Sequence, residues 1–174
     1  MQKHYEDNSL PELFRQAARA YADKVAIRHA DDEVKFHTLD ALSDRVAASL
    51  AHMQVGKGAR VGLYGIKSDA FIIAYLGIIK CGATVVPVNV LMNPKEIAWI
   101  LDDAEVEVLL YDGLVAAAVD ALAGELPELR KTVQIAGSHT AAEGQDWAAM
   151  MENSLPVPAP MFETATDVAA ILYT

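Results

Sequence analysis

Cysteine is nearly absent from this sequence of 174 residues, which contains only Cys81. A single cysteine forms neither an intramolecular disulfide nor a cysteine-based metal cluster, and it suits a reducing compartment, so we expect a cytoplasmic location. The N-terminus has no apolar core typical of a signal peptide. The longest apolar run, residues 70–79, is about half of the ~20 residues that span a bilayer. We interpret this run as a core helix and expect no transmembrane segment.

Positive charge is also scarce. The sequence has 14 Lys and Arg against 24 Asp and Glu, a net charge of −10, and it lacks the basic stripe typical of nucleic-acid binders. Its five histidines are scattered, with no pair at the spacing of helical metal ligands. We therefore expect neither a nucleic-acid partner nor a metal site. A hydrophobic content of 53% predicts a globular chain rather than a disordered one.

Familiar catalytic motifs are missing. The sequence has no Gly-x-Ser-x-Gly elbow, and no Gly-x-Gly-x-x-Gly fingerprint follows a predicted strand. Residues 62–68 look superficially like a phosphate loop, but no glycine precedes the lysine and only two residues separate Gly62 from Gly65. We interpret these glycines as close-packing positions and Ser68 as a helix N-cap. No catalytic residue is assigned.

The first part of the chain predicts a helix and a hairpin. Ser9 and Glu12 have the spacing of a capping box, which opens a helix that runs to Tyr21. Two short stretches, residues 25–29 and 34–37, indicate the strands of a β-hairpin.

A second helix is predicted after this hairpin, with Thr38 as its N-cap. Its apolar residues fall on one helical face, namely Leu39, Leu42, Val46, Leu50 and Met53. The Gly-Lys-Gly sequence at residues 56–58 is expected to end this region.

Strands and helices then alternate. The predicted strands are residues 60–65, 84–88, 107–111 and 131–136, and the predicted helices are residues 68–81, 93–104 and 114–122. This alternation predicts an α/β fold, a doubly wound and mainly parallel sheet with flanking helices and right-handed crossovers.

The last forty or so residues differ in character. Residues 137–167 are rich in Ala, Glu and Pro and predict an irregular surface excursion, with one short helix at residues 147–151. Residues 168–174 predict a buried strand. Because an interior parallel strand needs a following crossover, the chain is expected to be cut from a longer protein. The missing part would begin with a loop at the carboxyl end of that strand, where open α/β sheets bind ligands.

Several single residues carry further expectations. Cys81 ends an apolar helix and is interpreted as a small buried hydrophobic residue rather than a reactive thiol. Trp99 and Trp147 are interpreted as packing residues. Asp102 and Asp103 sit at a helix end where carboxylates oppose the dipole, which hints at function, although a solvated pair is the simpler interpretation.

Six segments, in this order and spacing, resemble one family. They are residues 13–27, 38–43, 56–61, 79–89, 96–104 and 170–174. Together they are similar to the N-terminal part of the adenylate-forming (AMP-binding) superfamily, which includes acyl-CoA synthetases, amino-acid adenylation domains and luciferases. The resemblance implies that residues 1–174 form the N-terminal part of the large AMP-binding domain and end before its phosphate-binding loop.

This resemblance also implies cofactors and substrates. The parent enzyme would use ATP, Mg and CoA to convert a carboxylic acid to an acyl-adenylate and then to acyl-CoA. Thr174 matches the residue that opens the phosphate-binding loop and is the one candidate cofactor contact, with no catalytic and no metal residue assigned. The fragment alone is expected to be inactive and to bind no cofactor.

The branch of the family follows from single positions. Asn89 stands where amino-acid adenylation domains typically have Asp, so an acid–CoA ligase is favoured. Residues 114–122 lack the arginines that acetate-activating members use as a CoA clamp. Two alternatives stay open: a stand-alone nucleotide- or CoA-binding module, and a non-catalytic oligomerisation domain. An exposed terminal strand would also permit a homodimer.

Overall fold

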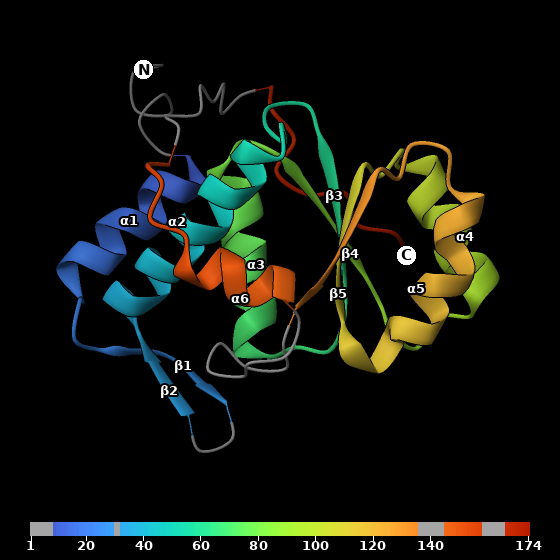
Figure 1. The fold of residues 1–174 in the computed structure, drawn as a ribbon. Coiled ribbons are helices and arrows are strands. Elements are labelled where there is room, and N and C mark those ends of the chain that lie inside the picture. The colour runs from blue at the N-terminus through green and yellow to red at the C-terminus, as the bar shows by residue number, and fades with distance from the viewer. Residues whose placement is uncertain (1–8, 30–31, 136–144, 158–165) are drawn as a thin grey trace.

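A computed structural model describes residues 9–29, 32–135, 145–157 and 166–174. At its centre is a four-stranded parallel sheet with the order β4-β3-β5-β6. Its strands are β3 (Arg60–Tyr64), β4 (Thr84–Val88), β5 (Val108–Asp112) and β6 (Lys131–Ile135). Helices cover both faces (Figure 1), and the predicted α/β fold with a parallel sheet is confirmed.

Helices cover both faces of the sheet, which explains why β3, β4 and β5 are apolar at most positions. The edge strand β6 keeps polar residues and buries only Val133 and Ile135. Leu63, Val85 and Leu110 face one core cluster, under helices α1, α2, α3 and α6, whereas Val86 and Leu109 face the other, under α4 and α5. Alternate residues of β3, β4 and β5 therefore pack into different cores, whereas β6 contributes Val133 and Ile135 to the first cluster.

The N-terminal layer begins with α1 (Leu10–Ala20), where the Ser9 side chain accepts a hydrogen bond from the Glu12 amide (3.4 Å). The predicted N-cap is thus confirmed. The antiparallel pair β1 (Val25–His29) and β2 (Asp32–Lys35) confirms the hairpin.

The second helix, α2 (Phe36–His52), has its N-cap at Lys35, three residues before the predicted Thr38, so the Thr38 cap is wrong. The second strand of the hairpin is Asp32–Lys35 rather than residues 34–37, because Phe36 and His37 already belong to the helix. Lys35 is the N-cap and makes no side-chain cap bond. Instead, the amides of Phe36 and His37 donate to the carbonyls of Lys24 (3.0 Å) and Ala22 (3.2 Å). Backbone acceptors from the preceding turn therefore replace a capping side chain.

The apolar face of α2 is confirmed, since Leu39, Val46 and Leu50 are buried and Leu42 and Met53 pack against the same core. The helix ends at His52, before the predicted end at residues 56–58. Gln54 then lies in the left-handed region (φ 63°), and the Val55 amide donates to the Leu50 carbonyl (3.0 Å). This is a Schellman-type ending with glutamine in the usual glycine position.

The remaining helices lie close to their predicted positions. They are α3 (Asp69–Lys80), α4 (Pro94–Asp103), α5 (Ala116–Leu122) between the 3₁₀ turns η1 (Gly113–Val115) and η2 (Ala123–Glu125), and α6 (Gln145–Glu152). Helix α6 confirms the short helix predicted at residues 147–151. The rest of the predicted excursion falls partly on residues 136–144 and 158–165, outside the described residues. None of the described helices has the length and hydrophobicity that a bilayer crossing requires.

The C-terminal segment differs from its prediction. Residues 168–174 make a single parallel bridge, Val85 to Ala170, instead of a buried strand. Val168 is 56% exposed and Leu172 is 71% exposed. The segment lies along the edge strand β4, at the margin of the sheet (Figure 1). Apolar composition alone did not distinguish this margin from the interior.

Candidate functional site

The central strands end at a switch point of the sheet. The chain passes from β3 to β4 on one side and then crosses to β5 on the other side of β3. Ligands of open α/β sheets bind outside the carboxyl ends of the strands at such a point. Here the residues that follow or end the strands are Gly65, Asn89 and Asp112.

Gly65 and Gly62 permit close packing, as predicted. A Cβ atom on Gly65 would lie 2.8 Å from the Asp112 Cβ, and one on Gly62 would lie 2.7 Å from a Leu109 methyl carbon. The Ser68 hydroxyl accepts a hydrogen bond from the Phe71 amide (3.1 Å) and caps α3. These contacts account for the glycines and the serine without a phosphate loop.

Asp112 is a polar residue at this edge that sequence reasoning missed. It is only 4% exposed. Its Oδ1 accepts from the Leu114 amide (2.8 Å), while its Oδ2 has no hydrogen-bond partner among the described residues. A buried carboxylate oxygen needs a donor or a water molecule. The sequence feature that could have identified Asp112 is an acidic residue at the end of an apolar strand, directly before Gly113.

The candidate cofactor residue Thr174 is exposed at the end of the C-terminal segment. Side chains hold that segment on the sheet. Lys57 pairs with Asp167 (3.0 Å), and the Thr84 hydroxyl donates to the Val168 carbonyl (2.7 Å). The Ile171 amide donates to the Val85 carbonyl (3.0 Å).

Tyr173 anchors the segment to α4. Its hydroxyl donates to Asp103 Oδ2 (2.6 Å), and its ring meets the Trp99 ring edge-on, with centroids 5.6 Å apart. Partial burial, followed by the hydrogen bond and the negative charge of Asp103, raises the pKa of Tyr173 to about 12. The phenol therefore stays protonated and remains a donor at neutral pH.

These contacts revise two predictions. Trp99 packs on Tyr173 but is 59% exposed, so it is a packing residue of the surface rather than of the core, whereas Trp147 is fully buried. Asp102 and Asp103 are both exposed, as predicted for a solvated pair, but Asp103 also has a specific partner in Tyr173.

A hollow of about 270 Å³ lies at the opposite end of the sheet, near the start of β3 and β4. Lys57, Arg60, Thr84, Asp167 and Ile171 are among its lining residues. Its cations are paired, Lys57 with Asp167 (3.0 Å) and Arg60 with Glu105 (2.6 Å). These pairs neutralise the charges that an anionic ligand would need.

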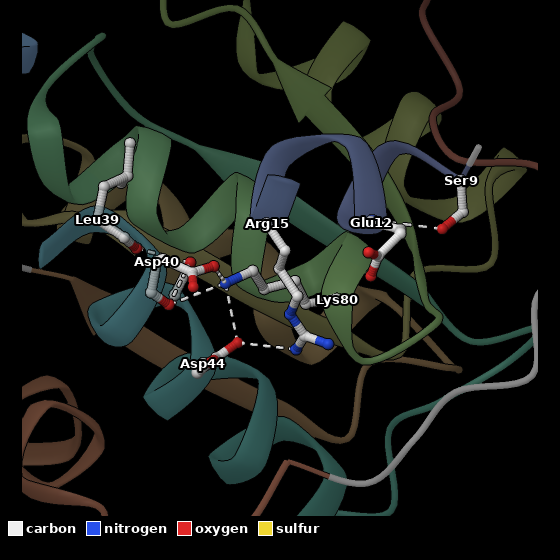
Figure 2. A network of polar contacts seen from close by, with 8 residues as sticks. Ser9, Glu12, Arg15, Leu39, Asp40, Asp44 and Lys80 are labelled. Carbon is white, nitrogen blue, oxygen red and sulfur yellow. Dashed lines mark hydrogen bonds and ion pairs between the residues drawn. The ribbon is translucent and has the colours of Figure 1, made fainter. Parts of the chain in front are cut away.

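Lys80 is a charged residue that lies almost fully buried, at the end of the apolar helix α3. Figure 2 shows its ammonium between Asp40 Oδ1 (2.6 Å) and Asp44 Oδ1 (2.8 Å), with Arg15 also reaching Asp44 (3.0 Å). The network joins α1, α2 and α3. Its contacts are internal, so we assign it to the scaffold.

Cys81 is buried as predicted, and burial raises the pKa of its thiol to about 11. Such a thiol is a poor nucleophile at neutral pH. Within the described residues, no group of three or more His, Cys, Asp or Glu side chains could hold a metal ion.

Comparison with known proteins gives the family. The model of the AMP-binding enzyme family matches residues 14–174. The chain is 32% identical over 168 residues to cyclosporin synthetase from Tolypocladium inflatum, which covers 97% of the chain and 1% of that protein. It is also 32% identical over 120 residues to a medium/long-chain-fatty-acid–CoA/3-oxocholest-4-en-26-oate–CoA ligase from Mycobacterium marinum, covering 69% of the chain and 21% of the ligase.

The fold agrees with a solved structure. The N-terminal domain of FACL13 from Mycobacterium tuberculosis superposes with a TM-score of 0.81 at 24% identity, covering 96% of this chain and 42% of that one. The chain therefore belongs to the AMP-binding, adenylate-forming enzymes, a family that includes acyl-CoA ligases. It spans about a fifth or less of the two curated relatives described above.

Proposed function

We propose that residues 1–174 are the N-terminal part of the large AMP-binding domain of an ATP-dependent acid–CoA ligase. The family match over residues 14–174 carries this proposal. The CoA ligase from Mycobacterium marinum and the ligase-like Asn89 support the branch. A fatty acid is the proposed substrate class, because that relative is named for fatty acids.

The reaction would proceed in two steps. A carboxylate oxygen attacks the α-phosphorus of MgATP and displaces pyrophosphate, which leaves an acyl-adenylate. The CoA thiol, losing its proton, then attacks the acyl carbon and displaces AMP. Activation is needed because a carboxylate oxygen is a poor leaving group, and charge on the phosphates must be stabilised by cations and donors.

This chain contributes mainly a scaffold to that reaction. Its hydroxyl at Thr174 would donate a hydrogen bond to an ATP phosphate, and the sheet would form one wall of the crevice. Asp112, Asn89 and Gly65 lie at the carboxyl ends of the strands. A lone hydroxyl does not hold MgATP, so we propose that the 174-residue chain is inactive and binds no cofactor by itself.

The proposal is tested by pyrophosphate release. The isolated chain, supplied with ATP, Mg, CoA and a panel of medium- and long-chain acids, is expected to release none, whereas the longer protein is expected to release pyrophosphate with at least one acid. Turnover by the isolated chain would contradict its assignment as a scaffold. Calorimetry separates the alternative of a stand-alone binding module, which predicts micromolar affinity for ATP or CoA.

A second candidate is an amino-acid-activating unit of a peptide synthetase. Cyclosporin synthetase supports it, because that similarity extends over 97% of the chain. Acid-dependent exchange of pyrophosphate into ATP discriminates the two candidates, since an adenylation unit responds to amino acids and a CoA ligase to fatty acids. Sedimentation tests a homodimer, for which the segment at residues 168–172, with its exposed Val168 and Leu172, is the proposed contact.

A further inference from the structure

We propose that Asp103 and Tyr173 form a latch that fixes Tyr173 to helix α4 and thereby positions the adjacent Thr174, so that both are positioning residues for the phosphate contact. This inference rests on the proposed function, because it assumes that Thr174 contacts an ATP phosphate. The latch consists of the hydrogen bond between the two side chains and the Trp99 ring that covers Tyr173.

The segment needs such an anchor because its backbone supplies little. Residues 168–174 make one bridge to β4, between Ala170 and Val85. Two backbone hydrogen bonds form it: the Val85 amide donates to the Ala169 carbonyl (3.0 Å), and the Ile171 amide donates to the Val85 carbonyl (3.0 Å). Beyond Ile171, the Tyr173 hydroxyl makes the next contact to another element. Tyr173 is adjacent to Thr174, so the latch constrains the last peptide units before the proposed phosphate contact.

Asp103 stands where a carboxylate is electrostatically disfavoured. It is the last residue of α4, and a negative charge at a helix C-terminus opposes the helix dipole. A hydrogen bond from Tyr173 offsets this disadvantage, since hydrogen bonds to charged acceptors are stronger than neutral ones. The neighbouring Asp102 shares the same helix end and makes no side-chain hydrogen bond or ion pair with the residues that the structure describes, so it is a natural control for the charge alone.

The aromatic contact restricts the latch to one geometry. The Trp99 and Tyr173 rings meet at 87°, an edge-to-face arrangement that aromatic pairs prefer. Ile171 and Tyr173 also pack against the core cluster under α4. Ring packing orients the phenol of Tyr173, and the hydrogen bond to Asp103 holds the hydroxyl at the C-terminal end of α4.

The first test measures the latch in the 174-residue chain. Tyr173→Phe keeps the ring contact and removes the hydroxyl, and Asp103→Asn removes the charged acceptor. Hydrogen exchange of the Ile171 amide is expected to be about fivefold faster in both variants, as loss of one hydrogen bond implies. Asp102→Asn is expected to exchange at the wild-type rate. Unchanged exchange in both latch variants, or an equal change in Asp102→Asn, would overturn the latch.

A spectroscopic readout checks the ring contact. Trp147 is fully buried, so fluorescence that acrylamide quenches comes from the exposed Trp99. Tyr173→Leu removes both ring and hydroxyl and should increase this quenching, while Tyr173→Phe should keep most of the protection. Equal quenching in wild type and Tyr173→Leu would show that the rings do not pack in solution and would overturn the latch.

The second test distinguishes positioning from stability. In the longer ligase, Tyr173→Phe and Asp103→Asn should raise KM for ATP in adenylate formation about fivefold, with KM for the acid and the unfolding temperature unchanged. Faster amide exchange with an unaltered KM for ATP would overturn the positioning role. A wild-type protein that forms no acyl-adenylate would instead overturn the proposed function, so the two failures are distinguishable.

Discussion

At the scale of single residues, the fold places a full charge in its core. Lys80 has no exposed side-chain surface, while Asp40 and Asp44 remain 25% and 32% exposed. The ammonium also lies 5.4 Å from the centre of the Phe14 ring. A buried cation is tolerated only when its partners are close and well oriented, and two carboxylates within hydrogen-bond distance meet this requirement.

Removal of the Lys80 charge should therefore destabilise the chain. Lys80→Met leaves Asp40 without its cation and Asp44 with Arg15 alone, and we expect the free energy of unfolding to fall by about 3 kcal/mol. Asp44→Asn is the milder control, because Lys80 keeps Asp40 and the amide is partly hydrated. Urea unfolding measures both changes. Equal stability of Lys80→Met and wild type would show that the network contributes nothing net.

Cys81 supplies a prediction on pH. Its thiol pKa rises from 9.0 to about 11 on folding, because burial disfavours the thiolate. The unfolded chain therefore loses this proton first, and the contribution of Cys81 to stability is retained below pH 9 and lost as pH rises toward 11. At pH 8 we expect alkylation of Cys81 to be slow in the folded chain and fast in urea. Rapid alkylation without denaturant would contradict this burial.

At the scale of elements, helix starts show two kinds of capping. Helix α3 starts with a side-chain cap, because Ser68 accepts from the Phe71 amide. Helix α2 starts with backbone acceptors, and Phe36 packs its ring near Phe14 (6.3 Å) and Tyr21 (6.2 Å). Only the first kind has a signature in the local sequence.

This difference predicts unequal effects of alanine. Ser68→Ala should lower the free energy of unfolding by about 1 kcal/mol, as loss of an N-cap usually does. Lys35→Ala, at the equivalent position of α2, should change it by less than about 0.5 kcal/mol, since Lys35 makes no cap bond. Thermal unfolding of the two variants compares them directly. A larger effect at Lys35 would reverse our assignment of the caps.

At the scale of the whole molecule, one sheet joins two cores. Leu109 and Leu110 are consecutive, both are fully buried, and they face opposite clusters. Because the strands carry residues of both clusters, neither core can unfold without disrupting the sheet. The two layers should thus behave as a single cooperative unit.

A matched pair of cavities tests that cooperativity. Leu109→Ala and Leu110→Ala should each cost about 2–5 kcal/mol and shift the whole transition. Circular dichroism and tryptophan fluorescence should give coincident curves in both variants. Two separate transitions, with only one moved by each substitution, would show that the cores unfold independently.

Much of this architecture follows from the sequence because its signals are short-range. The strands β3 and β4 are apolar at nearly every position, as burial on both faces requires. Ser9 and Ser68 are predicted capping residues with a local hydrogen-bond target, and the structure confirms both as N-caps. Asn93 caps α4 in the same way. The ordered family segments likewise predicted the fold before any contact was known.

Other features depend on residues that are distant in sequence, and only the tertiary structure decided them. Lys80 is buried because Asp40 and Asp44 come to it from another helix. Residues 168–174 lie at the margin of the sheet because they pair with β4, which is the edge strand of the order β4-β3-β5-β6. Strand order, rather than composition, therefore sets their position. Tyr173 meets Asp103 across seventy residues. Residue spacing over a few positions is enough to predict helix caps, strands and the buried faces of helices. Contacts between distant residues, such as Tyr173 with Asp103, form only when the whole chain has folded, so local spacing does not predict them.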